Sequence, residues 1–248
     1  MPLVRRSDHA GVATLTLNRP EKLNALTPQL VVELREHLGE IAVDDAVGCL
    51  VLRGAGRSFC AGLDIGGVGQ ESTPARRRAG AELVDLLESL PQPSIAAIHG
   101  YCFTGGLELA LGCDLLVATE SATIGDTHAR LGLVPVWGMS VRLPERVGRA
   151  RAKRILLTSE RLDARTAQQI GLLDSCWPDA EFDAELDRLT GAICGNSWGS
   201  NRRIKRLLGL PADERSLRLA LERTRPWGLP DDAAALPNPP HPTTTPGR

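Results

Sequence analysis

The stretch SIAAIHGYCFTGGLELALGCDLL, from Ser94 to Leu116, is the part of the sequence around which the rest of the chain is organised. Its pattern predicts a buried strand over Ser94–Ile98, a loop that contains the glycine pair Gly105 and Gly106, and then a short helix. A glycine-rich turn that opens a helix directs backbone N–H groups at whatever lies in front of it, and the helix dipole favours negative charge there. We therefore expect one half of an oxyanion hole at this turn.

A single carboxylate lies inside this short helix. Glu108 is flanked by Leu107, Leu109 and Ala110. Burying a carboxylate among apolar side chains is costly, so a glutamate in this position is a candidate acid/base residue. The alternative is a structural glutamate held by a salt bridge.

Strand and helix patterns alternate along the first part of the chain, and helices dominate later. Apolar runs predict strands at Gly11–Leu17, Cys49–Leu52, Asp114–Ala118 and Leu172–Cys176. A first helix is predicted from Pro28, after a Thr27 cap, and a second over AELVDLLESL, before Pro91. The remaining predicted helices are Met139–Val147, Arg149–Leu157, Ala164–Ile170 (capped by Asp163), Glu181–Cys194, Ser197–Leu208 and Asp213–Thr224. This order predicts an α/β protein with parallel strand pairs and right-handed crossovers.

Three regions are expected along the chain. Residues 1–178 would form the core with the active site, 179–228 a helical region that mediates oligomerisation, and 229–248 a proline-rich disordered tail. No internal repeat is visible.

The composition is that of a globular protein without a strong charge bias. The chain has 248 residues, is 42% hydrophobic and has a net charge of −1, which gives no support for a nucleic-acid or anionic-membrane partner. There is no apolar run long enough to span a membrane and no signal-peptide pattern at the N-terminus. The six cysteines are scattered, so buried free thiols in a reducing compartment are favoured over metal or disulfide use. We expect a cytoplasmic protein.

Glycine-rich loops follow three apolar strands, after Leu52, Ile98 and Ala118. Ligands of α/β sheets bind at the carboxyl ends of the strands, so these loops are the expected site. None of them has the spacing of a P-loop or of a dinucleotide-binding turn. A serine-hydrolase elbow and a metal-ligand cluster are also missing from the sequence.

Three segments of the sequence resemble those of a known protein family. SFCAGLDI (Ser58–Ile65) and HGYCFTGGLELALGCDLLVA (His99–Ala118) resemble the enoyl-CoA hydratase/isomerase family, also called the crotonase superfamily, and so does TLNRPEKLNALT (Thr16–Thr27). The resemblance implies the ClpP/crotonase fold, in which repeated ββα units form a layered core that is followed by a C-terminal helical region. It also implies a homotrimer or a dimer of trimers.

The resemblance implies that the substrate is an acyl-CoA thioester. Two backbone N–H groups would hold the thioester oxygen and stabilise an enolate; the matching positions are Ala61 and Gly105. This agrees with the argument from the helix N-terminus, although Ala61 and Gly62 by themselves are also typical of an ordinary tight turn. No separate cofactor is implied, because coenzyme A is part of the substrate.

The CoA-binding groove is assigned by the same resemblance. Its residues would be Lys22, Leu23, Ala25, Gly62, Leu63, Asp64 and Ile65, and Trp137 would be a wall of the acyl pocket or a packing residue. Lys22 and Arg19 would meet the phosphates of CoA; the alternative for both is a solvated charge.

The chain departs from the family pattern at one catalytic position. Hydratases of this family use two glutamates: one matches Glu108, and the second position holds His128, 20 residues later. An imidazole can take or give a proton near neutral pH. Glu108 would then act as the base, while His128 positions the water or delivers a proton to the α-carbon. The alternatives are that His128 only makes hydrogen bonds within its loop, or that activity is lost. Asp126 is expected to cap this loop; the alternative is that it substitutes as the acid, although it is two residues away from the expected position.

The resulting prediction is an enoyl-CoA hydratase, a lyase of fatty-acid metabolism that adds water to a trans-2-enoyl-CoA. The alternatives are an enoyl-CoA isomerase or another acyl-CoA lyase or hydrolase of the same family. A non-catalytic acyl-CoA-binding protein is the alternative outside enzyme function, since a binding protein needs no pair of proton-handling groups.

Overall fold

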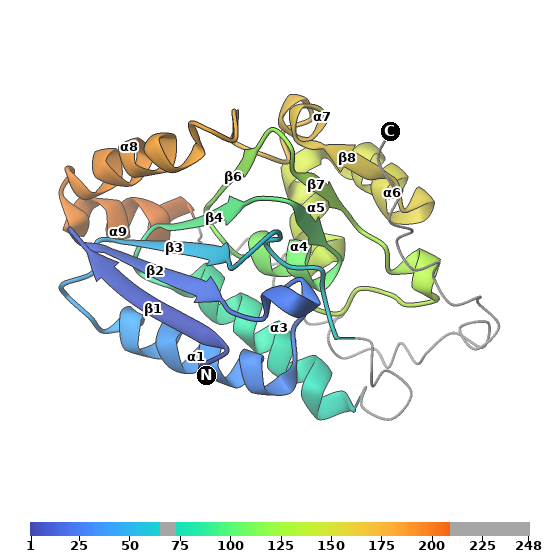
Figure 1. Cartoon of the computed structure of the whole chain (residues 1–248), viewed down its shortest axis with the longest axis horizontal. Coiled ribbons are helices and arrows are strands. Elements are labelled where there is room, and N and C mark those ends of the chain that lie inside the picture. The colour runs from blue at the N-terminus through green and yellow to red at the C-terminus, as the bar shows by residue number, and fades with distance from the viewer. Residues whose placement is uncertain (65–72, 209–248) are drawn as a thin grey trace.

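A six-stranded sheet forms the main layer of the molecule (Figure 1). The computed structural model describes residues 1–64 and 73–208. The strands follow the order β1 (Val4–His9), β2 (Val12–Leu17), β3 (Cys49–Gly54), β4 (Ser94–Ile98), β6 (Leu115–Thr119) and β9 (Ser175–Trp177). β1 is antiparallel to β2, and the other neighbouring pairs are parallel. The parallel core is therefore as predicted, and β1 is an edge strand that the sequence pattern did not reveal.

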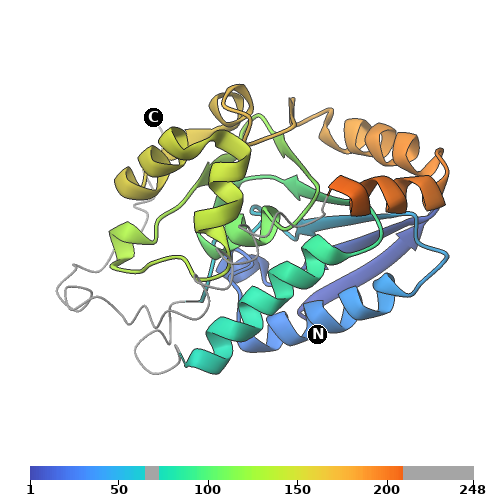
Figure 2. The ribbon, with the colours of Figure 1, turned by 180° about the vertical axis from the view of Figure 1, so that it is seen from behind.

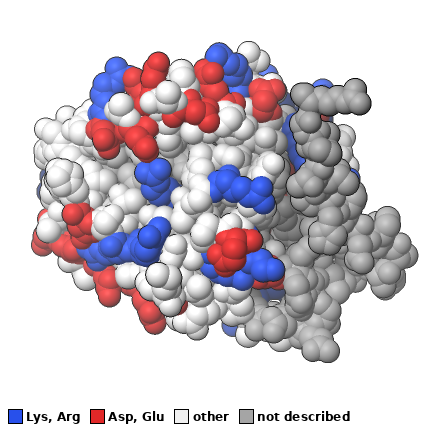
Figure 3. Space-filling view, viewed as in Figure 1, with Lys and Arg blue, Asp and Glu red and all other residues white. Residues whose placement is uncertain are grey.

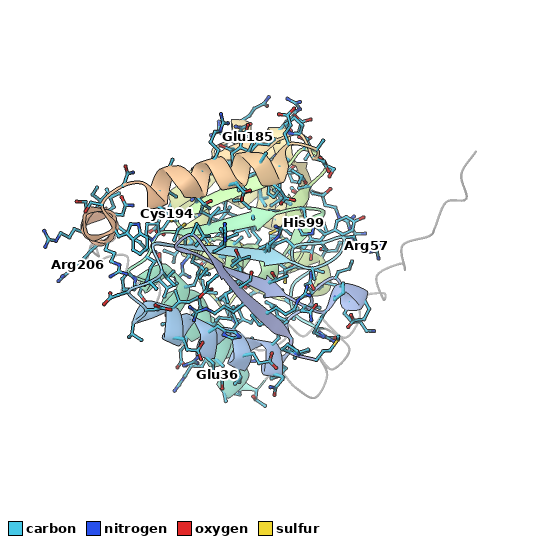
Figure 4. The ribbon with its side chains drawn as sticks, turned by 60° about the vertical axis from the view of Figure 1, so that its left-hand side comes forward. Glu36, Arg57, His99, Glu185, Cys194 and Arg206 are labelled. Carbon is cyan, nitrogen blue, oxygen red and sulfur yellow. The ribbon has the colours of Figure 1, made fainter. Side chains whose placement is uncertain are left out.

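Alternation of side chains along the strands gives the sheet two apolar faces. On β3, Leu50 and Leu52 join one core cluster, whereas Cys49 and Val51 join another. The first face is covered by α1 (Pro28–Ala42) and α3 (Pro74–Ser89), which lie side by side in the view from behind (Figure 2). The second face is covered by α8 (Phe182–Cys194), on the opposite side of the sheet from α1 (Figure 4). A three-layer α/β core results.

A smaller sheet lies beyond the carboxyl ends of the central strands. It consists of β5 (Tyr101–Phe103), β7 (Thr123–Gly125) and β8 (Arg161–Asp163), with β5 parallel to β7 and β7 antiparallel to β8. The helix α4 (Gly105–Ala110) begins directly after β5. Because β5 follows β4 and β7 follows β6, this small sheet holds the two loops that carry the predicted catalytic residues against each other.

The other helices agree closely with the predicted ones. They are α5 (Met139–Val147), α6 (Arg149–Thr158), α7 (Ala164–Gln169) and α9 (Trp198–Leu208), with short 3-10 turns at Pro20–Lys22 and Ala129–Leu131. Both predicted caps are confirmed: Thr27 accepts a hydrogen bond from the N–H of Leu30 at 3.2 Å, and Asp163 accepts one from Thr166 at 2.7 Å. The predicted helix over residues 213–224 and the predicted tail lie outside the described residues.

One predicted strand begins later than expected. The pattern placed it at Leu172–Cys176, but β9 begins at Ser175. The N–H groups of Leu172 and Leu173 both donate to the carbonyl of Ala167 and close the end of α7 instead of joining the sheet. An apolar pattern alone does not distinguish these two uses of a buried leucine pair.

The C-terminal helices pack on their own chain. Phe182 and Leu186 of α8 belong to the core cluster on the second face of the sheet, and Trp198 of α9 packs against Gly11 and Gly48. The oligomerisation role expected for residues 179–228 stays a prediction, since α9 also carries the exposed apolar side chains Ile204 and Leu208. The trimer stays a prediction.

The surface shows acidic and basic side chains interspersed on the face seen in Figure 3. This distribution fits the net charge of −1. Among the residues that the structure describes, no helix is both long enough and apolar enough to cross a bilayer.

Candidate active site

Three loops meet at the carboxyl ends of β3, β4 and β6. The Cys60 N–H donates to the carbonyl of Tyr101, and the Phe103 N–H donates back to Cys60, both at 3.0 Å. The Thr104 N–H donates to the carbonyl of Gly125, also at 3.0 Å. These main-chain bonds hold the loops after the three strands in fixed positions, as a preorganised site requires.

The N-terminus of α4 carries the N–H of Gly105. This residue begins the helix, so its N–H has no intrahelical acceptor, and it donates to no other group among the described residues. The neighbouring loop comes very close to it: a Cβ added to Gly62, whose φ is +102°, would lie 3.3 Å from the Gly105 nitrogen. A Cβ on Gly105 would lie 3.5 Å from the nitrogen of Leu63. Glycine is needed at position 62 for both its φ and this approach.

The structure changes one half of the predicted oxyanion hole. The N–H of Ala61 donates to the carbonyl of Leu23 at 3.0 Å, so the geometry contradicts the prediction that Ala61 is the second donor. Leu63, two residues on, lies next to Gly105, and its N–H donates to no group in the described part of the chain. The bonds on either side of it, from Leu26 to Gly62 and from Asp64 to Leu26, fix its backbone.

Glu108 is buried, with 2% of its surface exposed. One carboxylate oxygen, Oε1, accepts the backbone N–H of Trp137 at 2.9 Å and that of Met139 at 3.4 Å. The other oxygen, Oε2, lies 3.9 Å from Nε2 of His128. Glu108 thus faces an imidazole, and the predicted pair of Glu108 and His128 does come together.

His128 is itself held by a carboxylate. Its Nδ1 lies 2.5 Å from Oδ1 of Asp126, and its backbone N–H donates to Oδ2 of the same residue at 3.3 Å. The exposed fractions are 4% for His128 and 1% for Asp126. Asp126 caps the loop as predicted, but its contact with the imidazole was not predicted. The Asp-x-His spacing was the available signal, because an Asp side chain commonly returns to the residue two positions on.

A pair of threonines ties the two catalytic loops together. Oγ1 of Thr104 lies 2.6 Å from Oγ1 of Thr127, and the N–H of Thr127 donates to Thr104 Oγ1 at 3.3 Å. Thr104 has a φ of +55°, which is uncommon for a residue with a side chain. Because it directly precedes Gly105, this strained residue sets the direction in which the helix begins.

Trp137 is fixed at both its main chain and its ring. Its N–H donates to Glu108, and its carbonyl accepts Nη1 of Arg142 at 2.7 Å. The buried Arg142 also binds Asp85 at 2.8 Å and Glu88 at 2.7 Å on α3. A Cβ on Gly105 would lie 3.0 Å from the indole ring, so Trp137 packs directly against the start of α4. The packing role foreseen for Trp137 is thus present; its role in an acyl pocket stays a prediction.

The segment predicted to line the CoA groove is built around a buried asparagine. Asn24, fully buried, accepts the N–H of Arg19 at 2.8 Å and donates to the carbonyls of Ala55 at 2.9 Å and Ser58 at 2.7 Å. Asn24 and Leu23 both have a positive φ, near +50°. Asn is one of the few residues that adopts this conformation readily. Sequence reasoning assigned the neighbouring Leu23 and Ala25 to the groove but missed this anchoring role of Asn24.

The charges of this segment are partly engaged within the protein. Arg19 forms an ion pair with Asp64 at 2.9 Å and donates to the carbonyl of Ala25 at 2.6 Å. Lys22 is exposed at the 3-10 turn, and Leu63, which pairs with Leu26, is 43% exposed. Of the two cations expected to meet phosphates, Lys22 is the one that projects into solvent. Ile65 lies outside the described residues.

Metal and thiol chemistry have little support among the described residues. They contain no group of three or more His, Cys, Asp or Glu side chains placed to hold a metal ion. All six cysteines are free, and burial raises the pKa of Cys60, the one nearest the site, to about 12. A thiol with such a pKa is not a nucleophile at neutral pH.

The fold and the site are suited to one kind of chemistry, in which an oxyanion is stabilised and a proton is moved at a neighbouring carbon. The neighbouring N–H groups of Leu63, in a loop, and Gly105, at a helix N-terminus, suit an oxyanion that develops on a carbonyl oxygen, and a buried carboxylate facing an imidazole suits proton transfer at the carbons next to that carbonyl.

Comparison with known proteins names the family. The family model described as Enoyl-CoA hydratase/isomerase matches residues 7–218. A probable peroxisomal enoyl-CoA hydratase 1 of Arabidopsis thaliana is 35% identical over 210 residues, which are 84% of this chain and 79% of the relative. The 1,2-epoxyphenylacetyl-CoA isomerase of Escherichia coli K12 is 39% identical over 170 residues, 66% of this chain and 65% of the relative.

Solved structures agree with this placement. The crystal structure of an enoyl-CoA hydratase/isomerase from Xanthobacter autotrophicus Py2 matches with a TM-score of 0.83 and 31% identity, covering 89% of this chain and 84% of the other. The chain belongs to the enoyl-CoA hydratase/isomerase family and has its α/β crotonase fold.

Proposed function

We propose that the protein is an enoyl-CoA hydratase, which adds water to a trans-2-enoyl-CoA and yields a 3-hydroxyacyl-CoA. The observation that carries this proposal is the buried pair of Glu108 Oε2 and His128 Nε2, 3.9 Å apart, beside the unbonded N–H of Gly105. Several relatives, among them the one from Arabidopsis, have names that describe them as enoyl-CoA hydratases.

The thioester oxygen binds at the N–H groups of Leu63 and Gly105. Both donors are fixed by main-chain bonding around them, so they need no reorganisation when negative charge develops on that oxygen. Polarisation of the thioester makes the β-carbon electrophilic, and the electrons that arrive after addition of water are held as an enolate at the same two N–H groups.

Water is activated between the two side chains. A separation of 3.9 Å is too long for a direct hydrogen bond, but a water about 2.8 Å from each atom bridges it. Glu108 takes a proton from this water while the oxygen forms its bond to the β-carbon. The proton on His128 Nε2 is transferred to the α-carbon, and the enolate electron pair forms the new C–H bond. One proton leaves water, one reaches carbon, and the product is neutral at both carbons.

Hydration of crotonyl-CoA tests the proposal directly. The loss of the conjugated enoyl-thioester absorbance is followed for the wild type, Glu108→Gln and His128→Ala. We expect kcat to fall by about 10²-fold or more for each variant, the usual contribution of a general acid or base. Exposed Glu36→Gln on α1 is the control, with no expected change. Undiminished hydration by Glu108→Gln would overturn the assignment.

A second reaction fits the same groups. The Escherichia coli relative is named an isomerase, and a carboxylate and an imidazole on one enolate can also move a proton between carbons. Turnover of a 3-enoyl-CoA to the conjugated isomer, with no hydration of crotonyl-CoA, would favour isomerisation. Tight binding of CoA esters without turnover of either substrate would favour the non-catalytic binding protein.

The acyl-CoA thioester is thus the partner that the site supports best. A homotrimer or a dimer of trimers is proposed from family membership, and light scattering measures it. A cytoplasmic location also remains a prediction; the name of the Arabidopsis relative places that protein in peroxisomes.

A further inference from the structure

Three ionisable side chains stand in a line within the buried part of the site. Asp126 touches Nδ1 of His128 at 2.5 Å, and Nε2 of the same ring faces Glu108 at 3.9 Å. All three are at most 4% exposed. The ring therefore lies between two carboxylates, and bulk water contributes little screening to either interaction.

The charge balance of this line favours a protonated ring. With a neutral imidazole, two carboxylates would be buried within one small site, and a buried like-charge pair is costly. With an imidazolium, one positive charge lies between them, and both ring N–H groups point at carboxylate oxygens. Charge-assisted bonds of this kind are shorter than neutral ones, and 2.5 Å is a short separation.

The charged groups that the described residues place around the ring fit this balance. In the part of the chain that the structure describes, His128 lies within ion-pair distance of Asp126, on the same loop, and of Glu108, on α4. Arg130, on the 3-10 turn that follows, is exposed. The segment from Trp137 to Met139 presents backbone N–H groups to Glu108 rather than a charged side chain.

We propose that Asp126 and His128 act together as one neutral acid, with the transferable proton on His128 Nε2 and Asp126 as the positioning residue. The inference rests on the proposed hydratase function and deepens it. The pair of Asp126 carboxylate and His128 imidazolium has zero net charge and one proton to give, as a single carboxylic acid does. After the proton has left, the pair has a charge of −1, as the carboxylate would.

The proton balance closes over one turnover. The Nε2–H bond breaks as the enolate electron pair forms the C–H bond at the α-carbon, and the ring becomes neutral. Glu108, which has taken a proton from water, ends the step protonated. After product leaves, this proton passes from Glu108 to Nε2 across the 3.9 Å gap through a water, which restores the starting state.

Asp126 also fixes the ring orientation. An aspartate that accepts Nδ1–H keeps that nitrogen protonated in both states of the ring, so Nε2 is always the atom that exchanges a proton. The second oxygen of Asp126, bound to the backbone N–H of His128, prevents the carboxylate from turning away.

The test combines kinetics with a measurement that needs no turnover. Asp126→Asn keeps the shape but removes the charge, and we expect kcat for crotonyl-CoA to fall about 10²-fold or more while KM changes by less than about threefold. The control is Asp45→Asn on the surface, where the side chain is 96% exposed, with no expected change. A merely structural aspartate would instead lower the yield of folded protein and leave kcat per folded enzyme close to the wild type.

Nitrogen-15 NMR of the histidine rings gives the second measurement, with the His128 signals identified by their loss in His128→Gln. At neutral pH we expect two protonated ring nitrogens at His128 in the wild type and a neutral ring in Asp126→Asn. A neutral His128 ring in the wild type would overturn the proposal. If no enoyl-CoA is hydrated by the wild type, the hydratase function fails, and the NMR result still decides whether the pair is a protonated unit.

A double variant distinguishes a lost acid from a damaged loop. Asp126→Asn combined with His128→Glu replaces the charged pair by an uncharged amide and one carboxylic acid, so the net charge and the number of protons are as before. We expect this double variant to recover at least about tenfold of the kcat lost in Asp126→Asn. A double variant no more active than Asp126→Asn would contradict the equivalence of the pair to one acid.

Discussion

At the level of single residues, the chemistry of a side chain can be recognised in the sequence, whereas the geometry of the backbone cannot. Glu108 stood out because a carboxylate among leucines has few structural uses; the structure confirms that it is buried, and its acid/base role stays a prediction. His128 was singled out by the family resemblance, because it occupies the position of the second glutamate of the hydratases. The choice between Ala61 and Leu63 depends on the φ of Gly62 and on which N–H the neighbouring segment binds. Neither the φ of a residue nor the acceptor of its N–H follows from residue type. The loop was therefore predicted correctly, but the residue within it that supplies the N–H was not.

A glycine on α3 tests how closely Trp137 controls the site. A Cβ on Gly80 would lie 2.1 Å from Cε2 of the Trp137 ring, so Gly80→Ala must displace the indole. Since the Trp137 N–H holds Glu108, we expect kcat for crotonyl-CoA to fall at least about tenfold. Overpacking should also lower the free energy of unfolding by about 1–3 kcal/mol, measured by urea denaturation.

The control is a glycine in a helix with free space around it. Gly39 on α1 has no atom within 4 Å of an added Cβ. Gly39→Ala should raise the free energy of unfolding by up to about 1 kcal/mol through helix propensity and leave kcat unchanged. Equal kcat in both variants would show that the position of Trp137 does not matter to Glu108.

Whole elements were predictable where their patterns are long. The buried strands β4 and β6 and the helices α1 and α5 have enough residues for an apolar period or a cap to be visible. The strands β5, β7 and β8 have three residues each, too few for any period, and their pairing is decided by the loops around them. The small sheet that brings Glu108 and His128 together was for that reason not predicted, although both residues were.

The cap of α7 gives a prediction about pH. Asp163 accepts the backbone N–H of Thr166 at 2.7 Å and its hydroxyl at 3.0 Å, and these bonds lower the pKa of Asp163 below its ordinary value of 3.8. The folded state therefore binds this proton less tightly than the unfolded state. The stabilisation that the ionised Asp163 cap provides is complete above pH 3.8 and is lost as the pH falls through the lowered pKa.

Unfolding of Asp163→Ala at several pH values measures this effect. Loss of the cap should lower the free energy of unfolding by about 1 kcal/mol at neutral pH, and the difference from the wild type should shrink only below pH 3.8. Asp163→Asn keeps a capping oxygen without a charge, so its difference from the wild type should be smaller at neutral pH. A difference for Asp163→Ala that grows on acidification would contradict the prediction.

At the scale of the whole molecule, the catalytic loops and the last described helix occupy opposite ends of the sheet (Figure 1). The loops follow the carboxyl ends of β3, β4 and β6. α9 instead lies at their amino ends, where Lys205 binds the carbonyl of Gln92 at 3.0 Å and Asp114 at 2.7 Å. Alternating strands and helices predicted the layers and the end at which ligands bind. The docking of α9 on its own chain was not predicted, because an amphipathic helix does not specify which apolar surface it covers.

This separation predicts that two similar clashes have different consequences. A Cβ on Gly48 would lie 2.4 Å from Cε2 of Trp198, about as close as the corresponding contact between Gly80 and Trp137. Gly48→Ala should therefore lower the free energy of unfolding by about 1–3 kcal/mol, as Gly80→Ala does, because in both cases an indole must leave a tightly packed position. Its kcat and KM for crotonyl-CoA, measured where the variant is fully folded, should equal those of the wild type, since Trp198 packs against Gly11 and Gly48 at the amino ends of the strands. A loss of kcat in Gly48→Ala as large as in Gly80→Ala would mean that the packing at the amino ends of the strands reaches Glu108 through the sheet.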